Sequence, residues 1–329
     1  MTPSDIRPVV EAADRRIRPH VFETPLRRSD YLSRLAGAEV LCKLENVQIT
    51  GSFKARGAAN KIALLPELER NRGVVTASSG NHGAAVAAML QRFGGRGIVF
   101  VPATAPRVKV EAIRSSGVEV RFHSEDSGET EVGAQDYASA NGLTYVSPYD
   151  DPDIIAGQGT IGAEIERQAG AVDHVFVSVG GGGLVSGIAG FLKSGQRKVK
   201  IWGVSPLNDH SMRLSAEAGH AVPHTGASAT LSDGTAGTVQ PGAITVPLCR
   251  SLVDAWPLVT ESEIARAMRD YINRDNQLIE GAAGVAIAGL LQAAQSHTGE
   301  LRGSRIAVII CGGRIDPDKL IKVLKDEVK

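Results

Sequence analysis

The sequence has few cysteines, no net charge and no long apolar stretch. Its three cysteines (Cys42, Cys249 and Cys311) are far apart and form no CxxC pair, which argues against a disulfide framework and fits a reducing compartment. The 36 basic and 36 acidic residues balance without basic runs, so neither a nucleic-acid nor a membrane partner is expected. The N-terminus lacks the apolar core of a signal peptide, and no segment has the length to span a bilayer. We therefore expect a cytoplasmic protein.

What the sequence does contain is an alternation of β-rich runs with helical stretches. The first segment predicts an amphipathic helix, because Ile6, Val9, Val10, Ala13 and Ile17 fall at helical spacing. Strands that are apolar on both faces, between helices, predict parallel sheets covered on both sides. The length of 329 residues and two separate sets of alternation suggest two such α/β domains with a cleft between them. Strands are expected at 73–77, 97–101, 118–122, 143–146, 174–179, 199–205 and 305–310, and a loop-rich stretch at the surface or cleft at 203–247.

A tetraglycine turn follows the expected strand at 174–179. It consists of Gly180, Gly181, Gly182 and Gly183. Glycines let the backbone turn tightly and present several N–H donors, and the start of the following helix adds positive potential, which together suit a phosphate. The alternative is that these glycines serve only close packing. No Gly-Lys-Ser/Thr follows, so the turn is not a Walker loop.

Two further motifs lie at expected strand ends or helix starts, where open α/β sheets bind ligands. The motif SSGNHG at 78–83 follows the strand at 73–77 and is either ordinary helix capping or a site for a substrate carboxylate. His82 within it is a candidate ligand or a structural histidine. The motif GSFKARGA at 51–58 places Lys54 between Phe53 and a helix start of small residues, unlike a surface lysine. A lysine in a sheltered pocket loses basicity and becomes a nucleophile that can form an imine.

The order of these motifs resembles the serine/threonine dehydratase family, whose members are pyridoxal-phosphate (PLP) enzymes of the tryptophan-synthase-β fold, fold type II. The resemblance covers nearly the whole chain and includes LENVQITGSFKARGA, VPATAPRVKVEAIRSSG, PYDDPDIIAGQGTIGAE and LIEGAAGVAI. It implies two open parallel-sheet domains with PLP in the cleft between them. The large domain would comprise 1–50 and 148–329, and the small domain would comprise 51–147. A homodimer is also implied.

The resemblance also implies roles for individual residues. Lys54 would bind PLP as an imine and act as the base at Cα, and Ser79 would stand where serine racemase has an acid/base on the opposite face. The substrate carboxylate would be bound by Ser78, Ser79, Gly80, Asn81 and His82. The residues implied in cofactor binding are Phe53 on the ring, Asn81 on the 3-hydroxyl, Gly180, Gly181, Gly182, Gly183 and Leu184 on the phosphate, Gly234 on the other ring face, Glu280 near the 3-hydroxyl edge and Cys311 at the ring nitrogen.

The implied reaction is β-elimination from a small hydroxy-amino acid, such as L-threonine or L-serine, to a 2-oxo acid and ammonia. An amino-acid racemase of the serine racemase type remains an alternative, as does a dehydratase of a hydroxyectoine-derived substrate, since LSDGTAGTVQPGAITVPLC resembles that branch. Cysteine synthases differ at both motifs, with TSGNTG and KDR in place of SSGNHG and FKARG. A nucleotide-binding module lacks its spaced glycine fingerprint here, and a non-catalytic homologue would have no use for Lys54, Asn81 and the glycines together.

The sequence departs from the family pattern at several positions. Cys311 stands where a serine hydroxyl usually faces the ring nitrogen, and Arg314 replaces an asparagine, with a surface salt bridge as its expected use. Ser205 and Ser211 stand where relatives have acidic ligands for a divalent cation, and Asp209 alone is insufficient, so no metal site is expected. Because the chain ends at Lys329, we expect no regulatory C-terminal domain.

Overall fold

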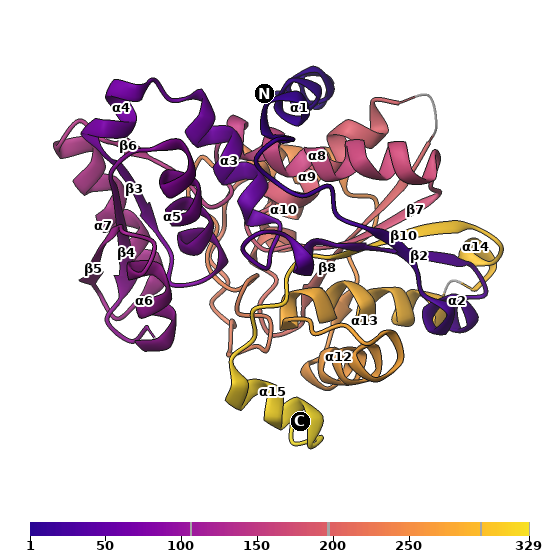
Figure 1. Ribbon diagram of the computed structural model, residues 1–329. Helices are drawn as coiled ribbons and strands as arrows, with labels where there is room; N and C mark the ends of the chain where they lie inside the picture. The colour runs from indigo at the N-terminus through magenta and orange to yellow at the C-terminus, as the bar shows by residue number, and fades with distance from the viewer. Residues whose placement is uncertain (106, 196–197, 297, 329) are drawn as a thin grey trace.

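The computed structural model describes residues 1–105, 107–195, 198–296 and 298–328, which form an α/β structure with two sheets (Figure 1). Within these residues the larger sheet has six strands, in the order β1-β2-β10-β7-β8-β9, and the smaller sheet has four, in the order β5-β4-β3-β6. The smaller sheet and its helices form a separate lobe on the left of Figure 1. The predicted architecture of two parallel-sheet units is confirmed.

The larger sheet is parallel except at one edge, where β1 pairs antiparallel with β2. The other five strands, β2, β10, β7, β8 and β9, run parallel to one another. The two strands in the middle of the sheet, β10 and β7, are almost fully buried. This burial on both faces explains why β7 and β10 read as continuous apolar runs. The antiparallel edge was not expected, because a three-residue strand is too short to show a period. The strands are β1 (Leu26–Arg28), β2 (Glu39–Leu44), β7 (His174–Ser178), β8 (Lys200–Pro206), β9 (Leu258–Val259) and β10 (Arg305–Ile310).

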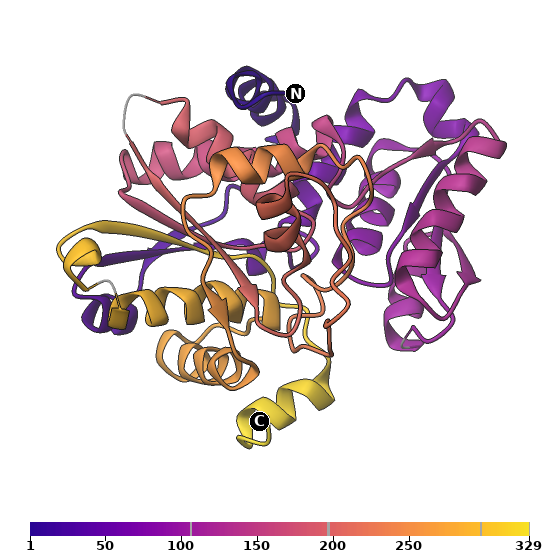
Figure 2. The same cartoon turned by 180° about the vertical axis from the view of Figure 1, so that it is seen from behind.

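Helices cover both faces of the larger sheet (Figures 1 and 2). On one face α13 lies against β7, β8 and β10, with α2, α12, α14 and α15 around it. On the other face lie α8 and α9, with α1, α10 and α11 packed outside them. No helix in the described ranges combines the length and apolar character needed to cross a membrane. The helices are α1 (Pro3–Ile17), α2 (Asp30–Ala36), α8 (Pro152–Ala169), α9 (Gly183–Lys193), α10 (Ser211–Ala218), α11 (Thr245–Leu252), α12 (Glu261–Asp275), α13 (Gly281–Ser296), α14 (Thr298–Leu301) and α15 (Pro317–Leu324).

The smaller sheet is entirely parallel and is also covered on both faces. Successive side chains of a strand point to opposite faces, so Val74 packs toward α5 while Val75 packs against Ala134 and Ala138 of α7. The helix α3 lies behind α5 and joins this unit to α8. The elements are β3 (Val74–Ala77), β4 (Gly97–Pro102), β5 (Glu119–His123), β6 (Thr144–Tyr145), α3 (Lys54–Leu64), α4 (Glu67–Arg72), α5 (Asn81–Phe93), α6 (Arg107–Arg114), α7 (Ser127–Ala140) and the short 3-10 helix η1 (Glu45–Val47) that precedes them.

The division of strands between the two sheets supports a proposal for the domain boundaries. All strands of the smaller sheet lie within 51–147, and those of the larger sheet lie in 26–44 and 174–310. We propose on this basis that 1–50 and 148–329 form the large domain and 51–147 the small one.

The structure confirms the amphipathic helix expected at the N-terminus and corrects the stretch 203–247. In α1, Ile6, Val10, Ala13 and Ile17 are at most 1% exposed, but Val9 is 38% exposed because it lies at the border of the apolar stripe. The stretch 203–247 is less irregular than expected, because β8 continues to Pro206 and α10 follows at Ser211–Ala218. The loops are the short connection 207–210 and the glycine- and proline-rich part after α10, up to the start of α11.

A buried ion cluster connects the start of α3 to the larger unit. Arg56 is fully buried, with Nε 2.7 Å from Glu45 Oε2 and Nη1 2.6 Å from Glu164 Oε1. Lys43 Nζ lies 2.6 Å from the other oxygen of Glu164. Burial alone would lower the pKa of Arg56, but the two carboxylates outweigh it and raise this pKa. The cluster therefore fixes α3, two residues beyond Lys54, to η1 and α8.

Replacing Arg56 by leucine should strongly destabilise the protein, because Glu45 would lose its ionic partner and Glu164 one of its two in a dry interior. We expect the free energy of unfolding in urea to fall by about 3–5 kcal/mol. The control is Arg114→Leu, which removes an exposed pair with Glu111 on α6 and should cost about 0.2–1 kcal/mol. Equal losses in the two variants would contradict a special role for the cluster.

Candidate active site

One cleft gathers the ends of strands from both sheets. Its volume is about 820 Å³, and it is lined by residues that follow β3, β7 and β10 at their carboxyl ends. Every site residue named from the sequence lines this cleft. These residues are Phe53, Lys54, Ser78, Ser79, Gly80, Asn81, His82, Gly180, Gly181, Gly182, Gly183, Leu184, Gly234, Glu280 and Cys311.

Lys54 belongs to the small unit by its helix but is held in place by the larger sheet. It is the first residue of α3, and the two residues before it are bonded to the end of β10. Ser52 bridges Gly312, and the Phe53 N–H donates to the Cys311 carbonyl at 3.0 Å. The Lys54 ammonium donates to the Pro148 carbonyl at 2.6 Å and lies 5.1 Å from the centroid of the Phe53 ring. The amine therefore projects into the cleft from a fixed base.

The surroundings of Lys54 weaken its basicity. Burial lowers the pKa of Lys54 to about 8, and the opposing fields of Glu131, Cys311 and Glu280 do not restore it. A much larger fraction of this amine than of a free lysine is therefore uncharged near neutral pH, and the uncharged state is the one that attacks an aldehyde. The sequence prediction of a sheltered lysine agrees with this environment.

The tetraglycine turn (residues 180–183) is required by packing. A Cβ at Gly180 would stand 2.8 Å from Thr235 Cα, and one at Gly181 would stand 2.2 Å from Tyr149 Cγ. Gly182 has φ +86°, in the left-handed region that favours glycine. Since α9 begins at Gly183, the free N–H groups of its first turn point toward the cleft end of the helix. Close packing and an anion-binding arrangement thus occur together.

We expect Gly181→Ala to weaken cofactor binding, because the new methyl group must displace the Tyr149 ring or the turn itself. The dissociation constant for PLP should rise by about tenfold or more, as for overpacking costs above 1.4 kcal/mol. It would be measured by equilibrium dialysis of PLP against apo-protein. Gly299→Ala is the control, because no atom of the described residues lies within 4 Å of a Cβ built there. A PLP affinity of Gly181→Ala equal to that of Gly299→Ala would contradict the expectation.

The motif at 78–83 forms a tight turn between β3 and α5. Ser78 Oγ accepts a hydrogen bond from the Gly80 N–H at 3.1 Å, and a Cβ at Gly83 would lie 2.1 Å from the Ser78 carbonyl oxygen. His82 Nε2 lies 3.1 Å from the Val146 carbonyl, which requires the proton on Nε2. Burial lowers the pKa of His82 to about 3, with the charge of Lys54 adding to the effect. His82 is therefore a neutral imidazole.

Asn81 and Glu280 form a pair across the cleft. Asn81 Nδ2 donates to both carboxylate oxygens of Glu280 at 2.9 Å. Burial raises the pKa of Glu280 to about 7, against the lowering effect of Asn81. The position facing the Glu280 carboxylate requires glycine, because a Cβ at Gly312 would stand 2.5 Å from Glu280 Oε1. Gly234 also lies close to this carboxylate. The pair links the small unit to the start of α13.

Cys311 is a buried, neutral thiol. It is 1% exposed, and Ser178 Oγ lies 3.6 Å from its sulfur as a donor. Burial raises the pKa of Cys311 far above neutrality. Arg314, three residues on, is exposed and lines the same cleft.

The side chain of Asp209 forms hydrogen bonds within the surrounding loops and does not belong to a cluster of metal ligands in the described residues. Its Oδ1 accepts from Ser211 Oγ at 2.7 Å, and its Oδ2 accepts from the Gly237 N–H at 2.8 Å. Ser205 Oγ donates to the Val179 carbonyl at 3.2 Å. In the described part of the chain, no group of three or more His, Cys, Asp or Glu side chains is placed to hold a metal ion.

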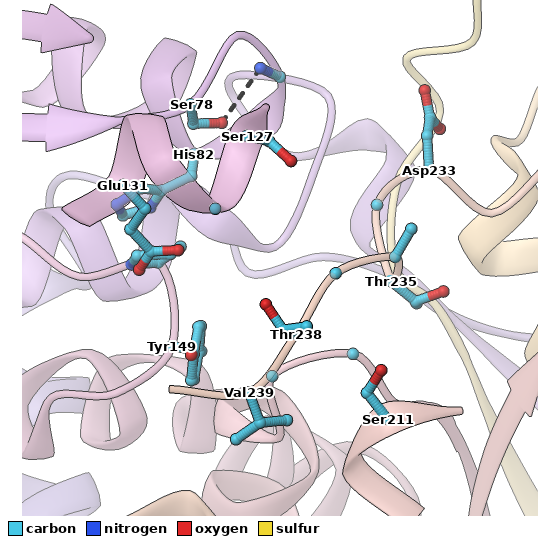
Figure 3. Close-up of a pocket in the computed structure, with 18 of the residues that line it drawn as sticks. Ser78, His82, Ser127, Glu131, Tyr149, Ser211, Asp233, Thr235, Thr238 and Val239 are labelled. Atoms are coloured by element: carbon cyan, nitrogen blue, oxygen red, sulfur yellow. Dashed lines mark hydrogen bonds between the residues drawn. The ribbon is translucent and has the colours of Figure 1, made fainter. Parts of the chain in front are cut away.

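Several residues of the cleft were missed by sequence reasoning. Figure 3 shows Glu131 beside His82, with Tyr149 and Thr238 on the neighbouring walls. Tyr149 lies in the PYDDP segment, which belongs to one of the motifs that carry the family resemblance. The motif does not indicate in which direction the Tyr149 side chain points. Glu131 reads as an ordinary polar residue of a helix, so no local pattern identifies it.

Comparison with known proteins defines the family. Residues 17–312 match the family described as "Pyridoxal-phosphate dependent enzyme". The chain is 37% identical over 321 residues to the catabolic L-threonine dehydratase TdcB of Escherichia coli (strain K12), covering 98% of this chain and 96% of the relative. Threonine deaminase isoform 2 from Solanum lycopersicum, in its processed form, superposes with a TM-score of 0.91 at 34% identity, over 98% of this chain and 92% of the other. Serine racemase from Dictyostelium discoideum superposes with a TM-score of 0.86 at 33% sequence identity, over 96% of this chain and 99% of the racemase chain.

The chain belongs to this family of pyridoxal-phosphate-dependent enzymes, and its cofactor is PLP. The cleft fits that group. It offers an amine of lowered pKa for the aldehyde and a turn closed to any Cβ at a helix start for the phosphate. Lys54 and the turn line the same space.

The rate at which apo-protein takes up PLP should follow the titration of Lys54. Only the uncharged amine attacks, so the rate should rise with pH and level off above about 8 rather than near 10.5. Borohydride trapping at each pH would measure it. A free alkylamine in the same buffers corrects for ionisation of PLP itself, and Lys54→Ala should trap nothing at this site. A corrected midpoint near that of a free lysine would contradict the sheltered environment.

Proposed function

We propose that the protein is a PLP-dependent ammonia-lyase that dehydrates a small hydroxy-amino acid, of the L-threonine or L-serine kind, to a 2-oxo acid and ammonia. The observation that carries this proposal is the position of Lys54. Its amine lies in one cleft with the tetraglycine turn on the larger unit and the Ser78–His82 turn on the smaller one. The relatives named as threonine dehydratase and threonine deaminase match over nearly the full chain, which supports the same chemistry here.

The residues that line the cleft divide into three groups around the cofactor. The first group would hold the phosphate through backbone N–H groups at the start of α9, and comprises Gly180, Gly181, Gly182, Gly183 and Leu184. The second would enclose the ring, with Phe53 and Gly234 on its faces and Asn81 and Glu280 at its 3-hydroxyl edge. Cys311 would face the ring nitrogen. When bound, PLP supplies an electron sink for the electrons released at Cα.

The substrate carboxylate would be bound at the turn formed by Ser78, Ser79, Gly80, Asn81 and His82. This turn leads directly into α5, a helix of 13 residues whose N-terminus favours an anion. Neutral His82 presents no competing charge, and its buried Nδ1 has no hydrogen-bond partner among the residues that the structure describes. A carboxylate fixed here orients Cα toward Lys54 across the cleft.

Lys54 would remove the proton at Cα once its amine is released from the cofactor. A pKa of about 8 suits a base that works near neutral pH, and the Pro148 carbonyl holds the amine in position. Ser79 also lines the cleft, and the resemblance to serine racemase supports it as a candidate acid/base for the opposite face. Proton transfer at this second face would give racemisation, which is why the test below includes both products.

The neutral thiol of Cys311 favours elimination over transamination. A thiol with a raised pKa carries no charge at neutral pH, so it would not stabilise a protonated ring nitrogen. Facing that nitrogen, the neutral thiol of Cys311 would keep the cofactor a weaker electron sink, which would favour loss of the β-hydroxyl over transamination. Cys311 is a weaker hydrogen-bond donor than serine, but both side chains are neutral, so the same effect on the ring nitrogen is expected.

We also propose that the protein is a cytoplasmic homodimer that acts without a divalent cation. The first two proposals rest on the family resemblance and on the composition. The third is supported by Asp209, whose oxygens are engaged by Ser211 and Gly237.

The decisive assay measures 2-oxo acid and ammonia from a panel of L- and D-hydroxy-amino acids, together with chiral analysis of the remaining substrate. We expect elimination by the wild type and a loss of about 10²–10⁴-fold in kcat for Lys54→Ala, since the base is removed. Ser79→Ala should retain elimination from the L-enantiomer. Formation of the opposite enantiomer without oxo acid would replace this proposal by a racemase.

A further inference from the structure

Ser178 and Cys311 form a buried hydroxyl–thiol pair in the cleft. Ser178 is the last residue of β7, and Cys311 directly follows β10, the parallel neighbour of β7 in the larger sheet. Both residues line the cleft, although Ser178 is only 5% exposed and Cys311 only 1%. Ser178 Oγ lies 3.6 Å from the Cys311 sulfur, with the hydroxyl as the donor. The proton of this serine is therefore directed at the sulfur.

The direction of this hydrogen bond determines how the thiol is oriented. A thiol combines one weak S–H donor with a weakly accepting sulfur. Because the sulfur accepts from Ser178, the proton of the thiol itself points away from the serine oxygen. Accepting a hydrogen bond also polarises the S–H bond, which strengthens a donor that is weak when it stands alone.

The location of the pair in the cleft follows from its neighbours along the chain. Ser178 stands two residues before Gly180, the first glycine of the turn that suits the phosphate. Cys311 adjoins Gly312, where a Cβ would meet Glu280 Oε1 at 2.5 Å. The pair therefore lies between the phosphate turn and the Glu280 carboxylate. These two groups would border the sides of the pyridine ring that carry the phosphate arm and the hydroxyl, and the ring nitrogen lies between those sides, opposite the aldehyde carbon.

We propose that Ser178 is a positioning residue whose hydroxyl turns the Cys311 thiol so that its S–H is donated to the ring nitrogen of PLP. The serine acts through the cysteine and need not touch the cofactor. Together the two side chains supply a donor of fixed direction, which a lone thiol supplies poorly. The inference rests on the placement of Cys311 at the ring nitrogen in the proposed function, and it adds the residue that orients the thiol.

The test compares PLP with its deaza analogue, in which a C–H group replaces the ring nitrogen. The two molecules have the same shape, aldehyde and phosphate, so a change in the ratio of their dissociation constants between variants reports on the ring nitrogen. Both constants would be measured by equilibrium dialysis against the full-length apo-protein. In Ser178→Ala the preference for PLP should fall about two- to tenfold relative to the wild type, as for one hydrogen bond between neutral groups. The affinity for the analogue should stay unchanged.

Variants of Cys311 establish whether the serine acts through the thiol. Cys311→Ala should lower the preference for PLP at least as much, and adding Ser178→Ala to it should change nothing further. Cys311→Ser should keep the preference, because a hydroxyl is the stronger donor. If Ser178→Ala is too unstable to measure, Ser178→Cys keeps the shape of the side chain with a weaker donor and should lower the preference in the same direction.

The chain contains a matched serine–cysteine pair outside the cleft lining. Ser186 Oγ and Cys249 Sγ are also buried and also lie 3.6 Å apart. This second pair is close to the tetraglycine turn, since Cys249 Sγ lies 3.8 Å from the Gly182 carbonyl oxygen. Ser186→Ala removes the same kind of hydroxyl–sulfur contact without facing the cofactor, so it should keep the wild-type ratio.

The outcomes separate this inference from the assignments on which it rests. A wild-type ratio in Ser178→Ala, with a lowered ratio in Cys311→Ala, would overturn the role of Ser178 and leave Cys311 at the ring nitrogen. Equal losses of affinity for both compounds in Ser178→Ala would show that the serine only fills space. A wild-type ratio in every variant would remove both residues from the ring nitrogen. Because dialysis requires no turnover, a failure to form 2-oxo acid and ammonia would overturn the lyase proposal alone.

Discussion

The site depends on the attachment of the lysine segment to the end of β10. The bridge between Ser52 and Gly312 and the hydrogen bond from Phe53 to Cys311 hold the start of α3 against the larger sheet. Lys54 therefore keeps its place relative to the tetraglycine turn although its helix belongs to the smaller unit. Two residues later, Arg56 repeats the connection through buried charges. The amine is fixed from both sides, which is what positioning of a nucleophile and base requires.

Burial has opposite consequences for the titratable groups of the cleft. It makes Lys54 a better nucleophile, keeps His82 uncharged and keeps the thiol of Cys311 protonated. It also raises the pKa of Glu280 to about 7 despite the two hydrogen bonds from Asn81, and it raises the pKa of Glu131. A single physical effect thus favours the neutral forms of the amine, the imidazole, the thiol and the carboxyl groups of the cleft.

Much of this arrangement was predictable from the sequence, and the exceptions have identifiable causes. Strands β4, β7 and β10 lie within one residue of their expected bounds, because buried parallel strands produce apolar runs ended by glycines or polar turns. Motifs at strand ends and helix starts predicted that Lys54, Asn81 and the glycines would lie in one cleft. Strand β1 and helix α10 are too short for a period to be seen. The direction of Glu131 and Tyr149 depends on contacts between distant segments, which no local pattern encodes.

The division of the cleft between two units has a consequence for its shape. The tetraglycine turn, Glu280 and Cys311 lie on the larger unit, while α7 contributes the wall that carries Glu131. A substitution on the cleft side of α7 therefore reshapes one wall and leaves the turn, the carboxylate and the thiol of the larger unit in place.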